Sequence, residues 1–133
     1  MSRVMVAVGL LVLSSACASA PSAPAAPQTL RYKRIVLSPE SREQPLVSPP
    51  ESVAMRSGRV VLQAGEDMHR HSTSGNEELL VFLQGSALVQ VGDQPVQMGA
   101  GQVLYIPPQT EHEVHNAGPG ELRYIYTVAP ARP

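Results

Sequence analysis

The residue types best suited to metal chemistry are concentrated in two short stretches of this sequence. All four histidines lie there, with His69 and His71 in the first stretch and His112 and His115 in the second. Alternate residues of a β-strand face the same side, so His69 and His71 could point into one cavity and share one metal ion. Glu78 and His112 could add an oxygen and a third nitrogen from neighbouring strands. Three histidines and one carboxylate suit a divalent transition metal with positions left for water or substrate.

Two separated motifs contain these residues. The first reads Gly65, three residues, His69-Arg70-His71, six residues, Glu78, six residues, Gly85. The second reads Gly101, five residues, Pro107-Pro108-Gln109, two residues, His112, three residues, Asn116. In their order and most of their spacing, residues 65–85 and 101–116 resemble the two motifs of the cupin superfamily, in particular its small single-domain, type-2-like, metal-binding members.

The resemblance implies both a fold and a ligand set. The fold would be a single double-stranded β-helix, a jelly-roll barrel, over residues 53–129. The metal ligands would be His69, His71, Glu78 and His112, holding one divalent ion of iron, manganese, nickel, copper or zinc. Gly85 and Gly101 would take turn positions, and Pro107 would lead into the strand that bears His112.

The sequence departs from the family pattern in three places. The spacer before His69 is shorter than usual, and the spacer between His71 and Glu78 is longer. The longer spacer leaves Glu77 and Glu78 as alternative ligands, because adjacent strand residues face opposite sides, and the distance to Gly85 favours Glu78. Gln109 replaces the usual turn glycine and would be strained in a left-handed turn.

Three side chains next to the expected ligands are assigned to other faces. His115 lies three residues after His112 and is expected to face away from the cavity. Met68 and Arg70 flank the first histidine pair and should also point away from the metal if that strand is regular.

Prolines and glycines divide the chain into unlike parts. Seven of the 13 prolines lie between residues 21 and 50, and nine of the ten glycines lie at or after Gly58. This distribution excludes a long helical bundle.

The sequence also predicts where the elements lie. An N-terminal arm is expected over 29–52. Its first residues, 29–37, are a strand or an extended arm, and residues 38–52 are an irregular loop. Short apolar runs punctuated by turn residues then predict an all-β domain with strands at 59–63, 78–84, 86–91, 94–98, 102–106, 111–116 and 122–129. Tight hairpin turns are expected at Gly85-Ser86 and Gly92-Asp93.

The first residues have the character of an export signal. Arg3 is followed by a largely apolar run over 4–13 and then by small residues up to Cys17, the only cysteine. Residues 13–17 resemble a bacterial lipobox, which implies a signal peptide over 1–16 and membrane attachment through lipidation of Cys17 in the cell envelope. Residues 17–28, rich in Ala, Pro and Ser, would then be a tether. The alternative is ordinary signal cleavage after Ala18 or Ala20, giving a soluble periplasmic or secreted protein.

The charge of the chain argues against a nucleic-acid partner and leaves several classes of function open. The net charge is −1, from 10 basic and 11 acidic residues, and no basic stripe indicates a nucleic-acid partner. In the resembling family this ligand set serves oxygenases, isomerases and lyases that act on small molecules, and Glu77 or a tyrosine could move a proton there. No catalytic residue is assigned. The alternatives are a non-catalytic envelope lipoprotein that binds a metal or small ligand, and a structural barrel that forms a homodimer.

Overall fold

The protein is all-β and consists of two antiparallel sheets, as the sequence predicts. The structure is a computed structural model and describes residues 32–132. The predicted signal peptide, Cys17 and the tether lie outside the described residues. Within the described range, no helix is long and apolar enough to cross a membrane.

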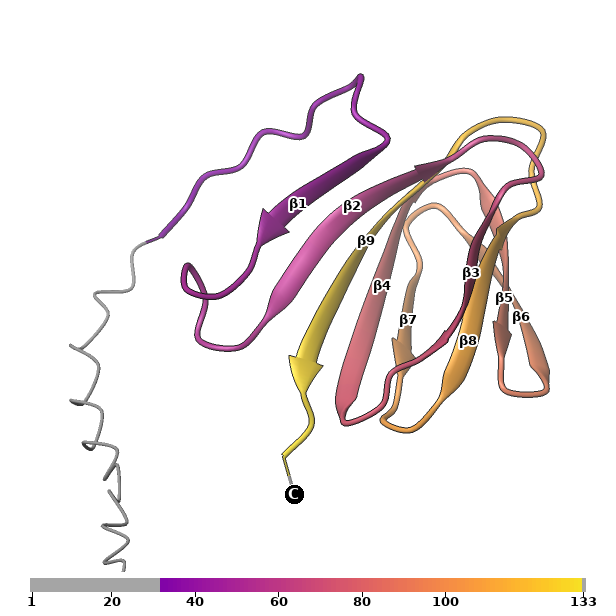
Figure 1. Cartoon of the computed structure of the whole chain (residues 1–133). Coiled ribbons are helices and arrows are strands. Elements are labelled where there is room, and N and C mark those ends of the chain that lie inside the picture. Colours follow the sequence, from indigo (N-terminus) through magenta and orange to yellow (C-terminus); the bar gives the residue numbers. More distant parts are fainter. Residues whose placement is uncertain (1–31, 133) are drawn as a thin grey trace, which may run out of the picture.

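The two sheets face each other and together form the barrel (Figure 1). One sheet has the order β1-β2-β9-β4-β7 and the other has the order β3-β8-β5-β6. The strands are β1 (Glu43–Val47), β2 (Arg56–Leu62), β3 (Asp67–Ser72), β4 (Asn76–Gln84), β5 (Ser86–Val91), β6 (Gln94–Gly99), β7 (Val103–Ile106), β8 (Glu111–Asn116) and β9 (Leu122–Pro130).

The space between the sheets is filled by the inward residues of both. In a strand these alternate with outward residues, so each strand contributes every second side chain. On β4, for example, Leu80 and Phe82 are fully buried, while Leu79 and Leu83 on the other face are exposed. The core cluster comprises Val60, Leu62, Leu80, Phe82, Ala87, Val89, Met98, Ile106, Val114, Leu122 and Tyr124. Its apolar contacts hold the two sheets, and therefore the two predicted motifs, against each other.

The prediction for residues 38–52 was wrong at one point, because β1 forms there. This strand pairs only with β2 and is therefore the edge of its sheet. Pro45 is tolerated because an edge strand needs ladder hydrogen bonds on one side only, and the pairing is irregular between Pro45 and Val47. The Leu46 side chain is buried, and this burial stabilises the attachment of β1 to the sheet. For residues 32–37, by contrast, the structure has no strand.

One of the two predicted hairpin turns forms and the other does not. Gly92, with φ 55°, and Asp93 connect the paired strands β5 and β6. Gly85 instead connects β4 in one sheet to β5 in the other, so it marks a crossover between sheets. Its φ is 85°, and a side chain there would place a Cβ 2.5 Å from the backbone oxygen of Glu121. Only glycine fits this crossover.

Gln109 adopts the left-handed backbone conformation in which its side chain is unfavourable. Its φ is 58°, in the turn that leads into β8. The expected strain at the position of the usual family glycine is therefore present. The backbone N–H of Gln109 donates to the Ser74 carbonyl oxygen at 2.9 Å, which helps to hold the turn against the loop between β3 and β4.

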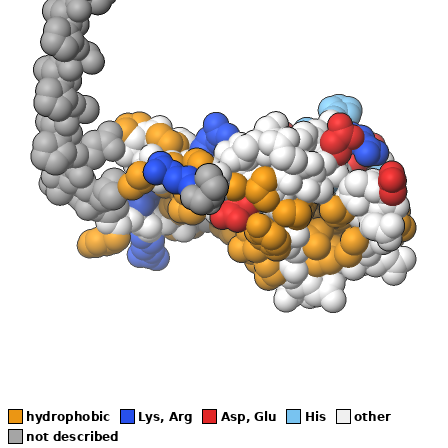
Figure 2. Space-filling model, turned by 90° about the horizontal axis from the view of Figure 1, so that it is seen from below, with side chains coloured by type: hydrophobic (Ala, Val, Ile, Leu, Met, Phe, Trp, Pro, Cys, Tyr) orange, Lys and Arg blue, Asp and Glu red, His pale blue; other side chains and the backbone are white. Residues whose placement is uncertain are grey.

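Part of the surface is apolar. Figure 2 shows hydrophobic side chains gathered on the side seen from below. Large hydrophobic side chains that remain exposed include Leu79 and Leu83 on β4 and Val103 and Tyr105 on β7. The homodimer expected as an alternative from the sequence stays a prediction.

We predict that Gly85→Ala destabilises the barrel much more than Gly65→Ala. Both glycines have a positive φ, near 80°, but a Cβ at Gly65 meets nothing within 4 Å. The left-handed conformation alone should cost about 1 kcal/mol at Gly65, whereas the added collision at Gly85 should bring the loss to about 3 kcal/mol. Urea unfolding of both variants measures the difference, and equal losses would show that the crossover relaxes freely.

Candidate metal centre

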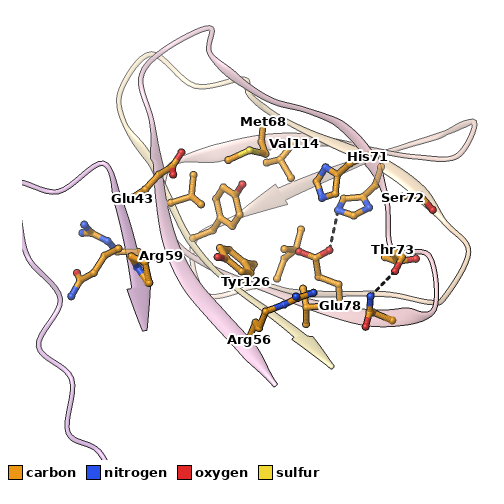
Figure 3. Close-up of a pocket in the computed structure, with 18 residues that line it drawn as sticks. Glu43, Arg56, Arg59, Met68, His71, Ser72, Thr73, Glu78, Val114 and Tyr126 are labelled. Carbon is orange, nitrogen blue, oxygen red and sulfur yellow. Dashed lines mark hydrogen bonds and ion pairs between the residues drawn. The ribbon is translucent and has the colours of Figure 1, made fainter. Parts of the chain in front are cut away.

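The two motifs meet in a cavity between the sheets. The cavity has a volume of about 400 Å³, and its lining includes His71 from β3, Glu78 from β4 and His112 from β8 (Figure 3). One ligand atom from each of these three side chains can be chosen so that all lie within 4.8 Å of one another. The fold thereby brings His71 and His112, which are 41 positions apart in the sequence, next to each other.

Glu78 and His112 form the buried half of the cluster. The Glu78 Oε2 atom lies 3.2 Å from His112 Nε2, and both side chains are buried, at 8% and 1% exposed. Glu78 stands on β4 between β9 and β7, and His112 stands on β8 between β3 and β5. Each is therefore fixed by hydrogen-bonded neighbours on both sides.

His71 forms the solvent-facing half. It is paired in register with His112, and the two rings lie 4.3 Å apart between centroids. His71 Nδ1 lies 2.8 Å from the His69 carbonyl oxygen. A carbonyl can only accept, so Nδ1 carries the proton and Nε2 keeps a free lone pair. A backbone contact of this kind orients a histidine for metal binding through its other nitrogen.

The three side chains fit a divalent metal ion. Two ligand atoms bound side by side at about 2.1 Å from a metal lie about 3 Å apart, close to the Glu78–His112 separation. His112 Nδ1 is buried and has no hydrogen-bond partner among residues 32–132. The nitrogen that faces Glu78 is Nε2, so Nε2 is the atom available to a metal, whereas the unsatisfied Nδ1 is a cost in stability. The nitrogen and oxygen donors suit several transition metals equally.

The structure does not bring His69 to this cluster. Met68 is paired with Val114 and His71 with His112, so β3 contains one extra residue between these pairs. This β-bulge breaks the alternation that would place His69 and His71 on one face. The His69 side chain is 99% exposed, and its Nδ1 lies 3.6 Å from Asp67 Oδ1. A role for His69 as a fourth ligand therefore remains a prediction that this geometry does not support.

The bulge also turns the neighbours of the histidines. Met68 packs against the core and lines the cavity, so the expectation that it points away was wrong. Arg70 does point away, and its Nε donates to Glu111 at 2.9 Å. His115 alternates with the buried Val114 and Asn116 and lies on the outer face, as expected.

Glu77 and Glu78 separate as the spacing to Gly85 predicts. Glu78 faces the cavity, and Glu77 accepts a 3.0 Å hydrogen bond from the Tyr105 hydroxyl on the outside of the sheet. That hydrogen bond to a carboxylate raises the pKa of Tyr105. Glu77 is thus excluded as a group that could move a proton in the cavity.

Thr73 is a positioning residue that the sequence did not reveal. Its buried hydroxyl donates to the Pro107 carbonyl oxygen at 2.9 Å and accepts from the Thr110 amide at 3.0 Å. These bonds tie the end of β3 to the start of β8, next to His71 and His112. No pattern in the sequence distinguishes Thr73 from the other polar residues of its loop.

Two tyrosines of β9 line the cavity. Tyr124 is 2% exposed and Tyr126 is half-buried, both on β9. Burial raises the pKa of Tyr124 strongly, with a smaller contribution from the negative charge of Glu78. Tyr124 is therefore a neutral phenol at physiological pH, which can donate a hydrogen bond and does not act as a phenolate base.

A comparison with known protein families identifies the family of this chain. The family described as the cupin domain matches residues 58–128, more than half of the chain. The chain belongs to the cupin family. The matched range contains every residue of both motifs, so the resemblance noted in the sequence is confirmed.

Solved structures of cupins share the fold. A cupin protein from Bacteroides fragilis aligns with a TM-score of 0.68 at 19% identity, covering 75% of this chain and 85% of the other. An RmlC-like cupin with a double-stranded β-helix fold, from Methanocaldococcus jannaschii, aligns with a TM-score of 0.65 at 21% identity, covering 74% and 91%. At this identity the likeness establishes the fold alone.

A dimethylsulfoniopropionate lyase of Ruegeria pomeroyi is similar over a shorter range. It is 40% identical over 63 residues, which are 47% of this cupin and 39% of the lyase. This cupin spans less than half the length of the curated relatives it matches.

The geometry predicts which variants lose metal. We expect His71→Ala and Glu78→Gln to weaken Co²⁺ or Zn²⁺ binding at least about 100-fold, because each removes a clustered donor. His69→Ala, matched to His71→Ala in type and strand, should bind like the unmodified protein. Calorimetric titration measures all three affinities. An equal loss in His69→Ala would mean that the bulge in β3 is remodelled when metal binds.

Proposed function

We propose that this cupin is a metal-dependent enzyme that acts on a small molecule. The observation that carries the proposal is the cluster of His71, Glu78 and His112 at the wall of a cavity between the two sheets. Three protein donors leave coordination positions open, which is typical of catalytic rather than structural metal sites. The expected ion is one of iron, manganese, nickel, copper or zinc.

The residues of the cavity have separable roles in this proposal. His71, Glu78 and His112 would hold the metal, which would supply Lewis-acid activation of a bound substrate. Leu80 and Val114 line the cavity and restrict water. Tyr124, as a neutral buried phenol, would donate a hydrogen bond to the substrate.

Among oxygenase, isomerase and lyase chemistry, lyase chemistry has additional support. The relative with 40% identity is a lyase. The aligned segment covers less than half of either chain, so the support concerns the type of reaction rather than the substrate. Lyase and isomerase reactions need no oxidant, whereas an oxygenase consumes dioxygen, which separates the classes by experiment.

The activity test compares metal-loaded protein with Glu78→Gln. We expect metal-loaded protein to convert at least one compound of a panel of phenolics, thiols, sugar acids and dimethylsulfoniopropionate without consuming oxygen. Product formation is followed by mass spectrometry and oxygen by electrode, and the Glu78→Gln variant should lose the activity. Tight metal binding without turnover of any compound would favour a non-catalytic binding protein. Oxygen uptake coupled to turnover would favour an oxygenase.

We also propose that the protein is exported and attached to the cell envelope through Cys17. The support is the sequence of residues 1–28, with its charged start, apolar run, small residues and single cysteine. The Ala-, Pro- and Ser-rich tether would separate the barrel from the membrane. Ordinary cleavage after Ala18 or Ala20 would instead release a soluble protein.

Cys17→Ala should release the protein from the membrane fraction of a bacterial host. Lipidation requires the cysteine thiol, so labelling with a radioactive fatty acid should disappear as well. Fractionation followed by immunoblotting measures the shift, and metal content serves as a control for folding. Unchanged membrane association of Cys17→Ala would refute the lipid anchor.

A further inference from the structure

We propose that Arg56 is an anion-binding residue of the cavity and that the ligand of this cupin is a small carboxylate. The second part rests on the proposed function, since it names the class of molecule that would meet the metal. The first part concerns the protein alone and can be tested without metal.

Arg56 lies on the cavity side of its strand. On β2 it shares its alternation with Gly58, Val60 and Leu62, and the last two belong to the core. Arg56 is paired with Val128 of β9, which also lines the cavity. In the view of Figure 3 its side chain extends in the direction of Glu78. Arg56 is exposed at the start of β2 and lines the cavity, so it brings a positive charge to the solvent side of the compartment that contains the candidate metal ligands.

The guanidinium of Arg56 is available to a ligand. Within residues 32–132, no carboxylate forms an ion pair with it, whereas arginines of the adjoining segments are paired, as in Arg42–Glu66, Arg70–Glu111 and Arg123–Glu121. Arg59 also lines the cavity, but its guanidinium donates to the Ser41 carbonyl oxygen. In Figure 3 its side chain lies beside β1.

Two tyrosine hydroxyls add neutral donors to the same compartment. Tyr124 is 2% exposed and lines the cavity. The Tyr126 ring is packed on Gly58, where a Cβ would lie 2.6 Å from the Tyr126 hydroxyl oxygen. Because Gly58 has no side chain, the Tyr126 ring can lie against it and form part of the cavity wall. A phenolic hydroxyl at the wall of a cavity can donate a hydrogen bond to a bound molecule.

These donors select a planar anion. A guanidinium presents parallel N–H groups that match the two oxygens of a carboxylate, and neutral phenols can donate further hydrogen bonds to the same oxygens. Glu78 and Glu43 also line the cavity and would repel an anion. A divalent metal on Glu78 would offset that repulsion, so anion binding should strengthen when metal is present.

The test measures acid binding with and without the Arg56 charge. Propionate, succinate and benzoate are titrated by calorimetry at constant ionic strength, each beside its neutral amide, into the purified protein before and after loading with Zn²⁺. The variants are Arg56→Met and Arg56→Lys. Arg34→Met is the matched control, because Arg34 is exposed outside the cavity and its removal changes the net charge equally.

We expect at least one acid to bind more tightly than its amide, and Arg56→Met to weaken that binding on the order of 10- to 100-fold. Arg56→Lys should retain part of the affinity, and Arg34→Met all of it. The same acid should protect Arg56, but not Arg34, from modification by phenylglyoxal, as read by mass spectrometry of metal-free protein. Equal binding of acids and amides, or unchanged acid affinity in Arg56→Met, would overturn the proposal. If the protein fails to bind Zn²⁺ but still binds the acid through Arg56, the proposed metal chemistry is overturned and the anion site is not.

Discussion

The contact between Glu78 and His112 is the constraint on which the rest of the site depends. It joins two polar side chains across the interior of a barrel whose other inward residues are mainly apolar. Burying such a pair is expensive, and a pair of apolar residues of similar size is often neutral or more stable. The fold therefore holds this pair despite its cost in stability, and the unpartnered Nδ1 of His112 adds to that cost. Costs of this kind are typical of functional sites.

Strand register decides whether this contact exists. A slip of one residue would turn every inward side chain of a strand outward, exchanging Glu78 for Glu77. The interior positions of β4 and β8 prevent the slip, because each strand is paired on both sides. β3 is an edge strand, paired only with β8, and it is there that a bulge occurs. Interior strands thus fix the buried ligands, and the edge strand carries the exposed histidines.

The sequence was sufficient for the parts of the fold that depend on alternation and turn chemistry. The strands from Gly58 onward, with the exception of the polar strand β3, follow from apolar periodicity. The turn at Gly92 follows from its glycine, and the inward position of Glu78 follows from the spacing to Gly85. The sequence was insufficient wherever pairing partners decide the outcome. The bulge at His69 becomes visible only when β3 is set against β8, and β1 forms only because β2 offers an open edge. Arg56 could have been found from its shared alternation with Gly58 and Val60, but an arginine at a strand end is usually solvent-exposed.

The cluster consequently has a fixed half and an open half. Glu78 and His112 are almost completely enclosed, whereas His71 is exposed on an edge strand whose ladder is already irregular. A metal ion held by these three groups would be anchored from the interior and accessible from the β3 side. The opposite wall, formed by β2 and β9, carries the hydrogen-bond donors of Arg56 and the two tyrosines. A molecule bound between these walls would meet the metal on one side and the donors on the other, so its position would be set by both sheets together.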